Sequence, residues 1–335
     1  MKRMIAALAV TMLLLLCFAG CNQIGQTTED STAETSGKKE SANVFAIAGP
    51  TGIGFANLMK KSDDGKALLD YHFSVESAPD AITAKIFTGE ADIAAIPTNL
   101  AAALYKKTSG SIQMLAINTG CVLSFVENGD TIHSVEDLKG KTIYSTGEGA
   151  NPEAILRYLL ESYGLDSRKD VNIRFVTENE ELATMLASGR AKIALVPEPL
   201  CTTVLMKNDQ LRVAFGVEDV WKETKRANMP QMGCVVARKA YIEEHPDAIQ
   251  LFLQEYEESI KNASEQVKET AALCETYQII PKAAIAEKAI PNCQLTFISG
   301  KDMQPVLQGY FDILYKANPK MLGGSLPEDG LYYIG

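Results

Sequence analysis

The sequence predicts an α/β protein of two similar lobes with a ligand held between them. Three observations support this fold class: one segment recurs, strand-like and helix-like runs alternate, and Gly or Pro loops follow the strands. Residues 82–100 read ITAKIFTGEADIAAIPTNL, and residues 182–200 read LATMLASGRAKIALVPEPL. In both copies an amphipathic run stops at a Gly, as helices do, and an apolar strand stops at a Pro, which cannot donate to a sheet ladder. Repeats this far apart exceed the roughly 50-residue period of a solenoid and indicate two related units.

The length and charge of the chain exclude several classes of protein. A chain of 335 residues suffices for one large or two ordinary domains. Its composition, 46% hydrophobic and 22% charged, is close to the globular average, so neither disorder nor membrane embedding dominates. The net charge of −10 argues against nucleic-acid binding, which needs clustered Lys or Arg to contact phosphates.

The N-terminus predicts export and a lipid anchor. Lys2 and Arg3 precede an apolar run at 5–18, which is shorter than the roughly 20 residues of a membrane span. The FAGC segment that ends at Cys21 resembles the lipobox of a bacterial lipoprotein signal. This resemblance implies that residues 1–20 are a signal peptide and that the Cys21 sulfur carries lipid. An ordinary cleaved secretory signal is the alternative.

The segment after the signal predicts a tether. Residues 21–42 are rich in Thr, Ser, Glu and Gly and hold almost no large apolar side chains, so they cannot offset the entropy of ordering. Beyond them lie five cysteines at irregular spacing without a CxxC pair, which indicates buried free thiols rather than a disulfide framework or a zinc site. We therefore expect no cofactor and no metal. These cysteines are Cys121, Cys201, Cys234, Cys274 and Cys293.

Both halves of the remaining chain share one order of elements: strand, glycine loop, helix, strand, helix, and a strand ending in Pro. This alternation implies parallel βα units. In the first half we expect a strand at 43–48, a loop at 49–54, a helix with Phe55 and Leu58, a strand at 71–77, the first repeat with its strand at 92–96, a helix through Tyr105 and a strand at 113–118. In the second half we expect strands at 142–145 and 171–176 around a helix begun by Pro152, then the second repeat, strands at 211–217 and 232–237, and a helical pattern over 245–318.

The crossings between the two lobes are predicted near 120–126 and 213–217. Lobe I would then comprise residues 43–120 plus 217–335, and lobe II would comprise residues 121–216.

Three segments resemble the substrate-binding proteins of ABC transporters, in particular the nitrate, sulfonate and taurine type that includes thiamine-precursor binders. These segments are GEADIAAIP at 89–97, VEDLKGKTI at 135–143 and GCVVARKAYIEEHPDAIQLFL at 233–253. The resemblance implies a type II periplasmic-binding-protein fold, with two lobes of mainly parallel sheet flanked by helices. It also implies a cleft that closes by hinge motion on a small polar or heterocyclic solute, which is sulfonate-like or a vitamin precursor. The solute would pass to an ABC permease in the cytoplasmic membrane. The protein would be a monomer, lipid-anchored on the outer face of a bacterial cell membrane.

The predicted ligand site lies on four loops and one strand end. Ligands of open α/β sheets bind beyond the carboxyl ends of the strands, where unpaired N–H groups at helix starts accept polar ligand atoms. The candidate residues are Thr51, Gly52, Ile53, Thr98, Asn99, Thr119, Thr146, Gly147, Glu148, Asn151 and Glu198.

Simpler interpretations of these residues stay open. The loops are compatible with ordinary βα turns, Thr98 and Asn99 with N-caps, and Glu198 with a solvent-exposed side chain. No Arg occurs in these loops, which favours a neutral or heterocyclic solute.

The sequence predicts no catalytic residue. None of the three histidines lies beside a GxSxG motif, and no HExxH or P-loop motif occurs. Two alternatives remain: an enzyme of the same fold in vitamin or quinone biosynthesis, against which the lipoprotein signal argues, and a ligand-sensing partner of a membrane receptor.

Overall fold

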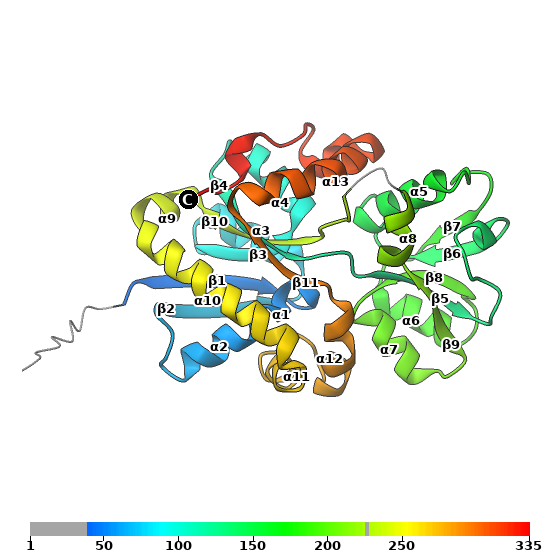
Figure 1. Cartoon of the computed structure of the whole chain (residues 1–335), viewed down its shortest axis with the longest axis horizontal. Helices are drawn as coiled ribbons and strands as arrows, with labels where there is room; N and C mark the ends of the chain where they lie inside the picture. Colours follow the sequence, from blue (N-terminus) through cyan, green and yellow to red (C-terminus); the bar gives the residue numbers. More distant parts are fainter. Residues whose placement is uncertain (1–38, 225–227) are drawn as a thin grey trace, which may run out of the picture. The chain divides into compact units, whose positions relative to one another are not determined.

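The computed structural model of the protein describes residues 39–224 and 228–335. The predicted signal peptide, Cys21 and all but the last residues of the predicted tether lie outside these ranges. Within them, no helix is long and apolar enough to cross a membrane. Their strands form two sheets with flanking helices (Figure 1).

The first sheet, sheet A, combines strands from both ends of the described chain. Its strands are β1 (Ser41–Ile47), β2 (Asp70–Glu76), β3 (Ile93–Pro97), β4 (Ile112–Thr119), β10 (Gly233–Arg238) and β11 (Leu295–Ser299). They lie in the order β11-β4-β10-β3-β1-β2. β1 pairs in parallel with β2 and β3, whereas β10 runs antiparallel between β3 and β4, and β11 pairs antiparallel with β4.

The second sheet, sheet B, repeats this arrangement. Its strands are β5 (Leu123–Asn128), β6 (Thr142–Ser145), β7 (Asn172–Phe175), β8 (Ile193–Pro197) and β9 (Leu211–Gly216). The order β7-β6-β8-β5-β9 matches the order β2-β1-β3-β10-β4 of sheet A, with the same parallel and antiparallel pairings. The repeated sequence segments become equivalent helix–strand units that end in β3 and β8. The predicted fold class is confirmed.

Helices cover both sheets. Those up to β9 are α1 (Pro50–Ile53), α2 (Ala56–Asp63), α3 (Pro79–Thr88), α4 (Thr98–Lys107), η1 (Glu136–Leu138), α5 (Asn151–Ser162), α6 (Asn179–Ala187) and α7 (Leu200–Lys207). Later ones are α8 (Val217–Thr224), α9 (Lys239–Glu244), α10 (Pro246–Glu265), α11 (Val267–Thr276), α12 (Ala283–Ala289), η2 (Ile290–Asn292), η3 (Gly300–Asp302), α13 (Met303–Ala317), η4 (Pro319–Leu322) and η5 (Asp329–Leu331). α10 and α11 pack on α2, whereas α12 contacts α7 and α13 contacts α5. The C-terminal helices therefore touch helices that belong to both sheets.

Alternate residues of the central strands enter different hydrophobic clusters. In β3, Ile93 and Ala95 pack in one cluster while Ala94 and Ile96 pack in another. Because side chains alternate across a strand, this division means that both faces of sheet A are covered. Continuous apolar strands such as 93–96 follow from this double burial.

One predicted element is wrong. The helical pattern expected over 245–318 is interrupted by β11, which pairs antiparallel with β4 at the edge of sheet A. Its five residues are only partly buried and their hydrogen-bond partners lie far away in the sequence, so local periodicity does not identify the strand.

The second crossing lies later than the predicted 213–217. β9 and α8 both pack against β5 of sheet B, and the chain joins sheet A again only at β10. α8 stays with sheet B because Trp221, 2% exposed, packs its ring 4.8 Å from that of Tyr158 in α5. The amphipathic pattern of the VEDVWKET segment at 217–224 could have predicted this helix.

Candidate functional site

The four predicted loops occupy equivalent positions in the two sheets. In each case a strand that belongs to the parallel part of a sheet ends, and a helix begins within a few residues. The pairs are β1 and α1, β3 and α4, β6 and α5, and β8 and α7. This position is where open α/β sheets bind ligands.

Beside sheet A, Asn118 contacts α1 through the backbone of Thr51. Its Nδ2 donates to the Thr51 carbonyl oxygen at 2.9 Å and to the Tyr256 hydroxyl at 2.8 Å. Thr119 donates from Oγ1 to the Asn118 Oδ1 at 3.0 Å. A Cβ on Gly233 would lie 2.7 Å from that Oδ1, so the close approach of β10 requires glycine. Gly52 and Ile53, in α1, are buried beside this network.

Two members of this network, Asn118 and Tyr256, were difficult to predict from the sequence. Asn118 could be placed near the site only because it lies near the end of a predicted strand. Tyr256 lies on α10, which the sequence predicts as a helix with no link to the site. Burial raises the pKa of Tyr256, so its hydroxyl keeps its proton and accepts or donates as a neutral group. Finding it required the tertiary structure.

Thr98 and Asn99 begin α4 without capping it through their side chains. Thr98 is fully buried; its Oγ1 donates to the Gln231 carbonyl oxygen at 2.6 Å. Asn99 accepts from the Nδ2 of Asn151 at 3.0 Å. That hydrogen bond joins the start of α4, which follows β3 of sheet A, to the start of α5, which follows β6 of sheet B.

The loop after β6 contains four of the predicted residues. Thr146 donates to the Asn179 Oδ1 at 3.1 Å, and Glu148 is exposed. Gly147 has φ +79, a conformation that suits glycine, and a Cβ there would also lie 2.9 Å from the Pro152 ring. Asn151 is 6% exposed, and its Oδ1 has no hydrogen-bond partner in the described part of the chain.

Glu198 is buried rather than exposed to solvent. It is 5% exposed; its Oε2 accepts from the Thr202 N–H at 3.2 Å and its Oε1 from the Asn292 Nδ2 at 3.4 Å. Burial raises the pKa of Glu198, against the opposite effect of hydrogen bonds from Thr202 and Asn292. Asn292, in η2, makes a second tie between the two sheets. It was not predicted, because it lies in the stretch read as continuous helix.

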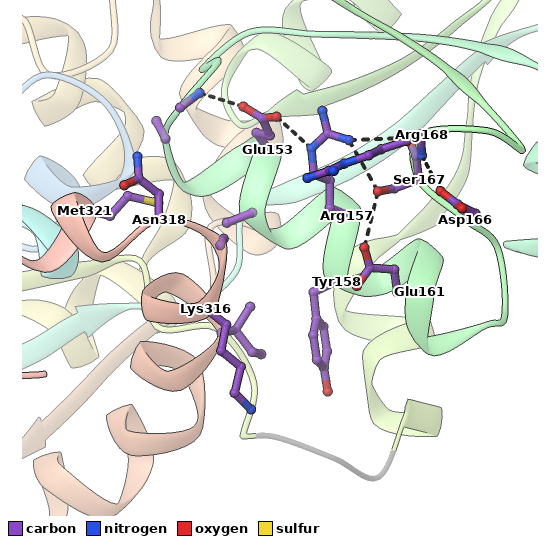
Figure 2. Close-up of a pocket in the computed structure, with 15 residues that line it drawn as sticks. Glu153, Arg157, Tyr158, Glu161, Asp166, Ser167, Arg168, Lys316, Asn318 and Met321 are labelled. Atoms are coloured by element: carbon purple, nitrogen blue, oxygen red, sulfur yellow. Dashed lines mark hydrogen bonds and ion pairs between the residues drawn. The ribbon is translucent and has the colours of Figure 1, made fainter. Parts of the chain in front are cut away.

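A cavity of about 520 Å³ lies between α5 and α13 (Figure 2). It is lined by Gly149 and Ala150 of the loop after β6, but by none of the predicted ligand residues. Its charged lining balances: Arg157, Arg168 and Lys316 against Glu153, Glu161 and Asp166. Figure 2 shows that Glu153 and Ser167 hold the Arg157 guanidinium, with the Glu153 oxygen 2.7 Å from Nε.

The described residues hold no cluster of His, Cys, Asp or Glu suited to a metal ion. The five cysteines beyond Cys21 are free and buried, as predicted. Each described histidine lies near one acidic side chain and not in the four loops: His72 near Asp70, His133 near Asp130, and His245 near Glu40.

Comparison with known proteins adds a family match. The family described as "ABC transporter, phosphonate, periplasmic substrate-binding protein" matches residues 65–281, more than half of the chain. No curated protein matches the sequence. The match confirms the resemblance to substrate-binding proteins of ABC transporters.

Several solved structures share the fold. An ABC transporter protein from Parabacteroides distasonis is 23% identical with a TM-score of 0.74, covering 88% of this chain and 98% of that one. The periplasmic aliphatic sulphonate binding protein SsuA from Escherichia coli is 15% identical with a TM-score of 0.67, covering 84% and 94%. The periplasmic nitrate-binding protein NrtA from Synechocystis PCC 6803 is 13% identical with a TM-score of 0.53, covering 79% and 75%. These similarities establish the fold of the chain.

Proposed function

We propose a function from one premise: this chain belongs to the family of ABC-transporter phosphonate periplasmic substrate-binding proteins. It is a solute-binding protein that acts outside the cytoplasm and works with an ABC permease. We propose that its solute is a small polar or heterocyclic organic molecule held by the four loops at the strand ends. The observation that carries this proposal is a pair of hydrogen bonds at these loops: Asn151 donates to Asn99, and Asn292 in η2 donates to Glu198.

The proposed mechanism is closure of two lobes around the solute. Sheet A with its helices would form one lobe and sheet B the other, with the predicted boundary at 216 moved to the end of α8. Closure brings α4 toward α5 and η2 toward α7, where the two hydrogen bonds form. A solute that contacts both lobes favours this closed form because it binds the closed form more tightly than the open one.

We also propose the remaining features on the sequence alone. Cys21 carries lipid, residues 21–42 tether the protein to the outer face of the membrane, and the protein is a monomer without enzymatic activity. Confinement near the permease raises the effective concentration of the binding protein without new contacts.

Solute binding is tested by thermal unfolding together with uptake. We expect the unfolding midpoint to keep rising as solute is added, because the stabilisation grows with the logarithm of the solute concentration. At about 100 times the Kd it amounts to about 2.7 kcal/mol. Native mass spectrometry of the tag-free protein identifies the co-purified solute to be added. Deletion of the gene should abolish uptake of that solute. Turnover of the solute, or uptake that survives deletion, would contradict the proposal.

The anchor is tested by the variant Cys21→Ser. We expect this variant to appear in the soluble fraction rather than with membranes, because stable attachment needs the lipid chains. The measurement is fractionation followed by mass determination of the mature N-terminus. Cys293→Ser is the matched control and should stay with the membrane. Equal membrane retention of both variants would exclude lipidation at Cys21.

A further inference from the structure

Asn128 and Gly129 form the only Asn-Gly pair of the chain. The pair lies where β5 ends: Asn128 is the half-buried last residue of the strand, and Gly129 is exposed. Asparagine is one of the thermolabile residues of proteins. Its side-chain amide is lost when the backbone nitrogen of the next residue reaches the side-chain carbonyl carbon. A following glycine leaves the most room for this approach because it has no Cβ.

The two groups that would react at this pair are not held by hydrogen bonds. Every other asparagine in the described ranges uses its side-chain amide in at least one hydrogen bond. The Asn128 side chain forms none with any described residue, and neither does the backbone N–H of Gly129. Asn208 shows the contrast, because its Oδ1 accepts from the Gln210 N–H at 2.9 Å.

The loop that follows β5 encloses the buried carboxylate of Glu127. Both carboxylate oxygens accept from the Thr131 N–H, at 2.9 and 3.1 Å. Arg212 holds the other side: its Nη2 donates to Glu127 at 2.7 Å, and its Nε donates to the Gly129 carbonyl oxygen at 3.0 Å. We call this loop, residues 129–132, the Glu127 cage. Its hydrogen bonds fit only one length of main chain after Glu127.

We propose that Asn128 is a site of spontaneous deamidation and that one of the products opens the Glu127 cage. The Gly129 nitrogen attacks the Asn128 Cγ and loses its proton to water, and the side-chain nitrogen leaves as ammonia. Water then opens the cyclic imide at either carbonyl group. Opening at the side-chain carbonyl gives ordinary aspartate. Opening at the backbone carbonyl gives isoaspartate, in which the main chain runs through Cγ. Water is the only other reactant.

The isoaspartate product disrupts the cage. It adds a methylene group to the main chain between Glu127 and Gly129. The Gly129 carbonyl and the Thr131 N–H then no longer reach Arg212 and the Glu127 carboxylate together. Glu127 is 2% exposed, so a donor that it loses is not replaced by bulk water. A buried carboxylate that loses its donors destabilises the folded state.

The aspartate product leaves the cage intact. It keeps the length of the main chain and adds only a negative charge. Asn128 Nδ2 and Lys192 Nζ each lie 3.8 Å from the position that a Cβ on Gly189 would occupy, so the new carboxylate forms near an ammonium group. Lys192 is exposed, and an exposed ion pair changes stability little. We therefore expect the loss of stability to come from isoaspartate.

This site is separate from the loops of the proposed solute site. Glu127 pairs with Ile193 at the start of β8, whereas Glu198 follows the end of that strand. The modification limits the lifetime of the folded protein, whichever solute the protein binds. The inference therefore does not rest on the proposed function.

Ageing of the purified protein tests the reaction. The protein is incubated at mildly alkaline pH, digested and mapped by mass spectrometry with electron-based fragmentation, which distinguishes isoaspartate from aspartate. We expect both products at Asn128, formed at least about tenfold faster than any product at Asn208, a difference of about 1.4 kcal/mol in activation free energy. Asn208 is the matched comparison because it is also half-buried but its side chain is held by hydrogen bonds.

Thermal unfolding of the aged protein tests the consequence. The isoaspartate-containing fraction should unfold at least about 2 °C below the fresh protein, a shift that accompanies a modest loss of stability in a protein of this size. Aged Asn128→Gln should keep its midpoint, because its side chain would have to close a larger ring that forms more slowly. Freshly purified Asn128→Asp carries the charge without the longer main chain and should unfold at the wild-type midpoint.

Four results would overturn the proposal. The first is formation of products at Asn128 no faster than at Asn208. The second is an isoaspartate-containing fraction that unfolds at the midpoint of the fresh protein. The third is an equal loss of stability on ageing in Asn128→Gln. The fourth is a fresh Asn128→Asp protein that unfolds at as low a temperature as the isoaspartate fraction, which would assign the loss to charge instead of to the main chain.

Discussion

Replacing Arg212 with Met is expected to destabilise the protein by about 3–5 kcal/mol, because it leaves the buried Glu127 carboxylate without its cation. The Arg212 Nη2 lies 2.7 Å from Glu127 Oε2 and donates to the Ile132 carbonyl oxygen at 2.7 Å. Glu127 is 2% exposed, so water cannot replace the lost partner. Urea unfolding of both proteins at neutral pH measures the difference. The surface pair of Lys169 with Asp166 is the control, since Lys169→Met should cost no more than about 1 kcal/mol.

The same variant should change the pH dependence of stability. Burial acts to raise the pKa of Glu127, but hydrogen bonds from Thr131 and Ile132 together with Arg212 outweigh it and lower the pKa. A lowered pKa in the folded state stabilises the protein above the unfolded pKa of about 4.3, and this contribution is lost as the pH falls through the folded value. Without Arg212 the folded pKa moves up, so the unfolding free energy should fall less steeply as the pH drops below the unfolded pKa of about 4.3. An unchanged slope would show that Arg212 does not set this titration.

Replacing Phe252 with Ala is expected to cost about 3–5 kcal/mol, the usual range for a buried Phe. Phe252 is fully buried on α10, with its ring centroid 5.3 Å from that of Tyr256 and 6.2 Å from that of Phe55. The loss reaches the candidate site, because the Tyr256 hydroxyl accepts from Asn118, which in turn holds the Thr51 carbonyl. Amide hydrogen exchange in residues 51–54 should therefore accelerate beyond what global unfolding explains.

The control for this variant is Phe87→Ala on α3. Phe87 is 53% exposed, so its removal should change the unfolding free energy by no more than about 0.5 kcal/mol. If amide hydrogen exchange in residues 51–54 is unchanged in Phe252→Ala, the aromatic cluster does not stabilise the segment before α2.

The sequence predicted those features whose causes are local. Gly89 and Gly189 end helices in the left-handed conformation, and Pro97 and Pro197 end strands, so both repeats were located correctly. The same prolines predicted where the loops after these strands begin. Each cause lies within a few residues of its effect.

The missed features depend on contacts between distant residues. β11 is a strand because it extends sheet A beside β4, and Asn292 matters because Glu198 lies opposite it. The burial of Glu198 was also beyond the sequence, since a Glu between two prolines reads equally well as a surface residue. Such properties arise from the packing of the two sheets and have no local pattern.

Sheet A contains a strand from late in the sequence, β10, between two strands from early in the sequence, and this affects how the sheet can form. β10 separates β3 from β4, and it lies at 233–238, far after both of them. Before β10 and β11 are made, β3 therefore has one unpaired edge and β4 has no neighbouring strand on either side. These positions in sheet A are filled only once the residues of β10 and β11 are available.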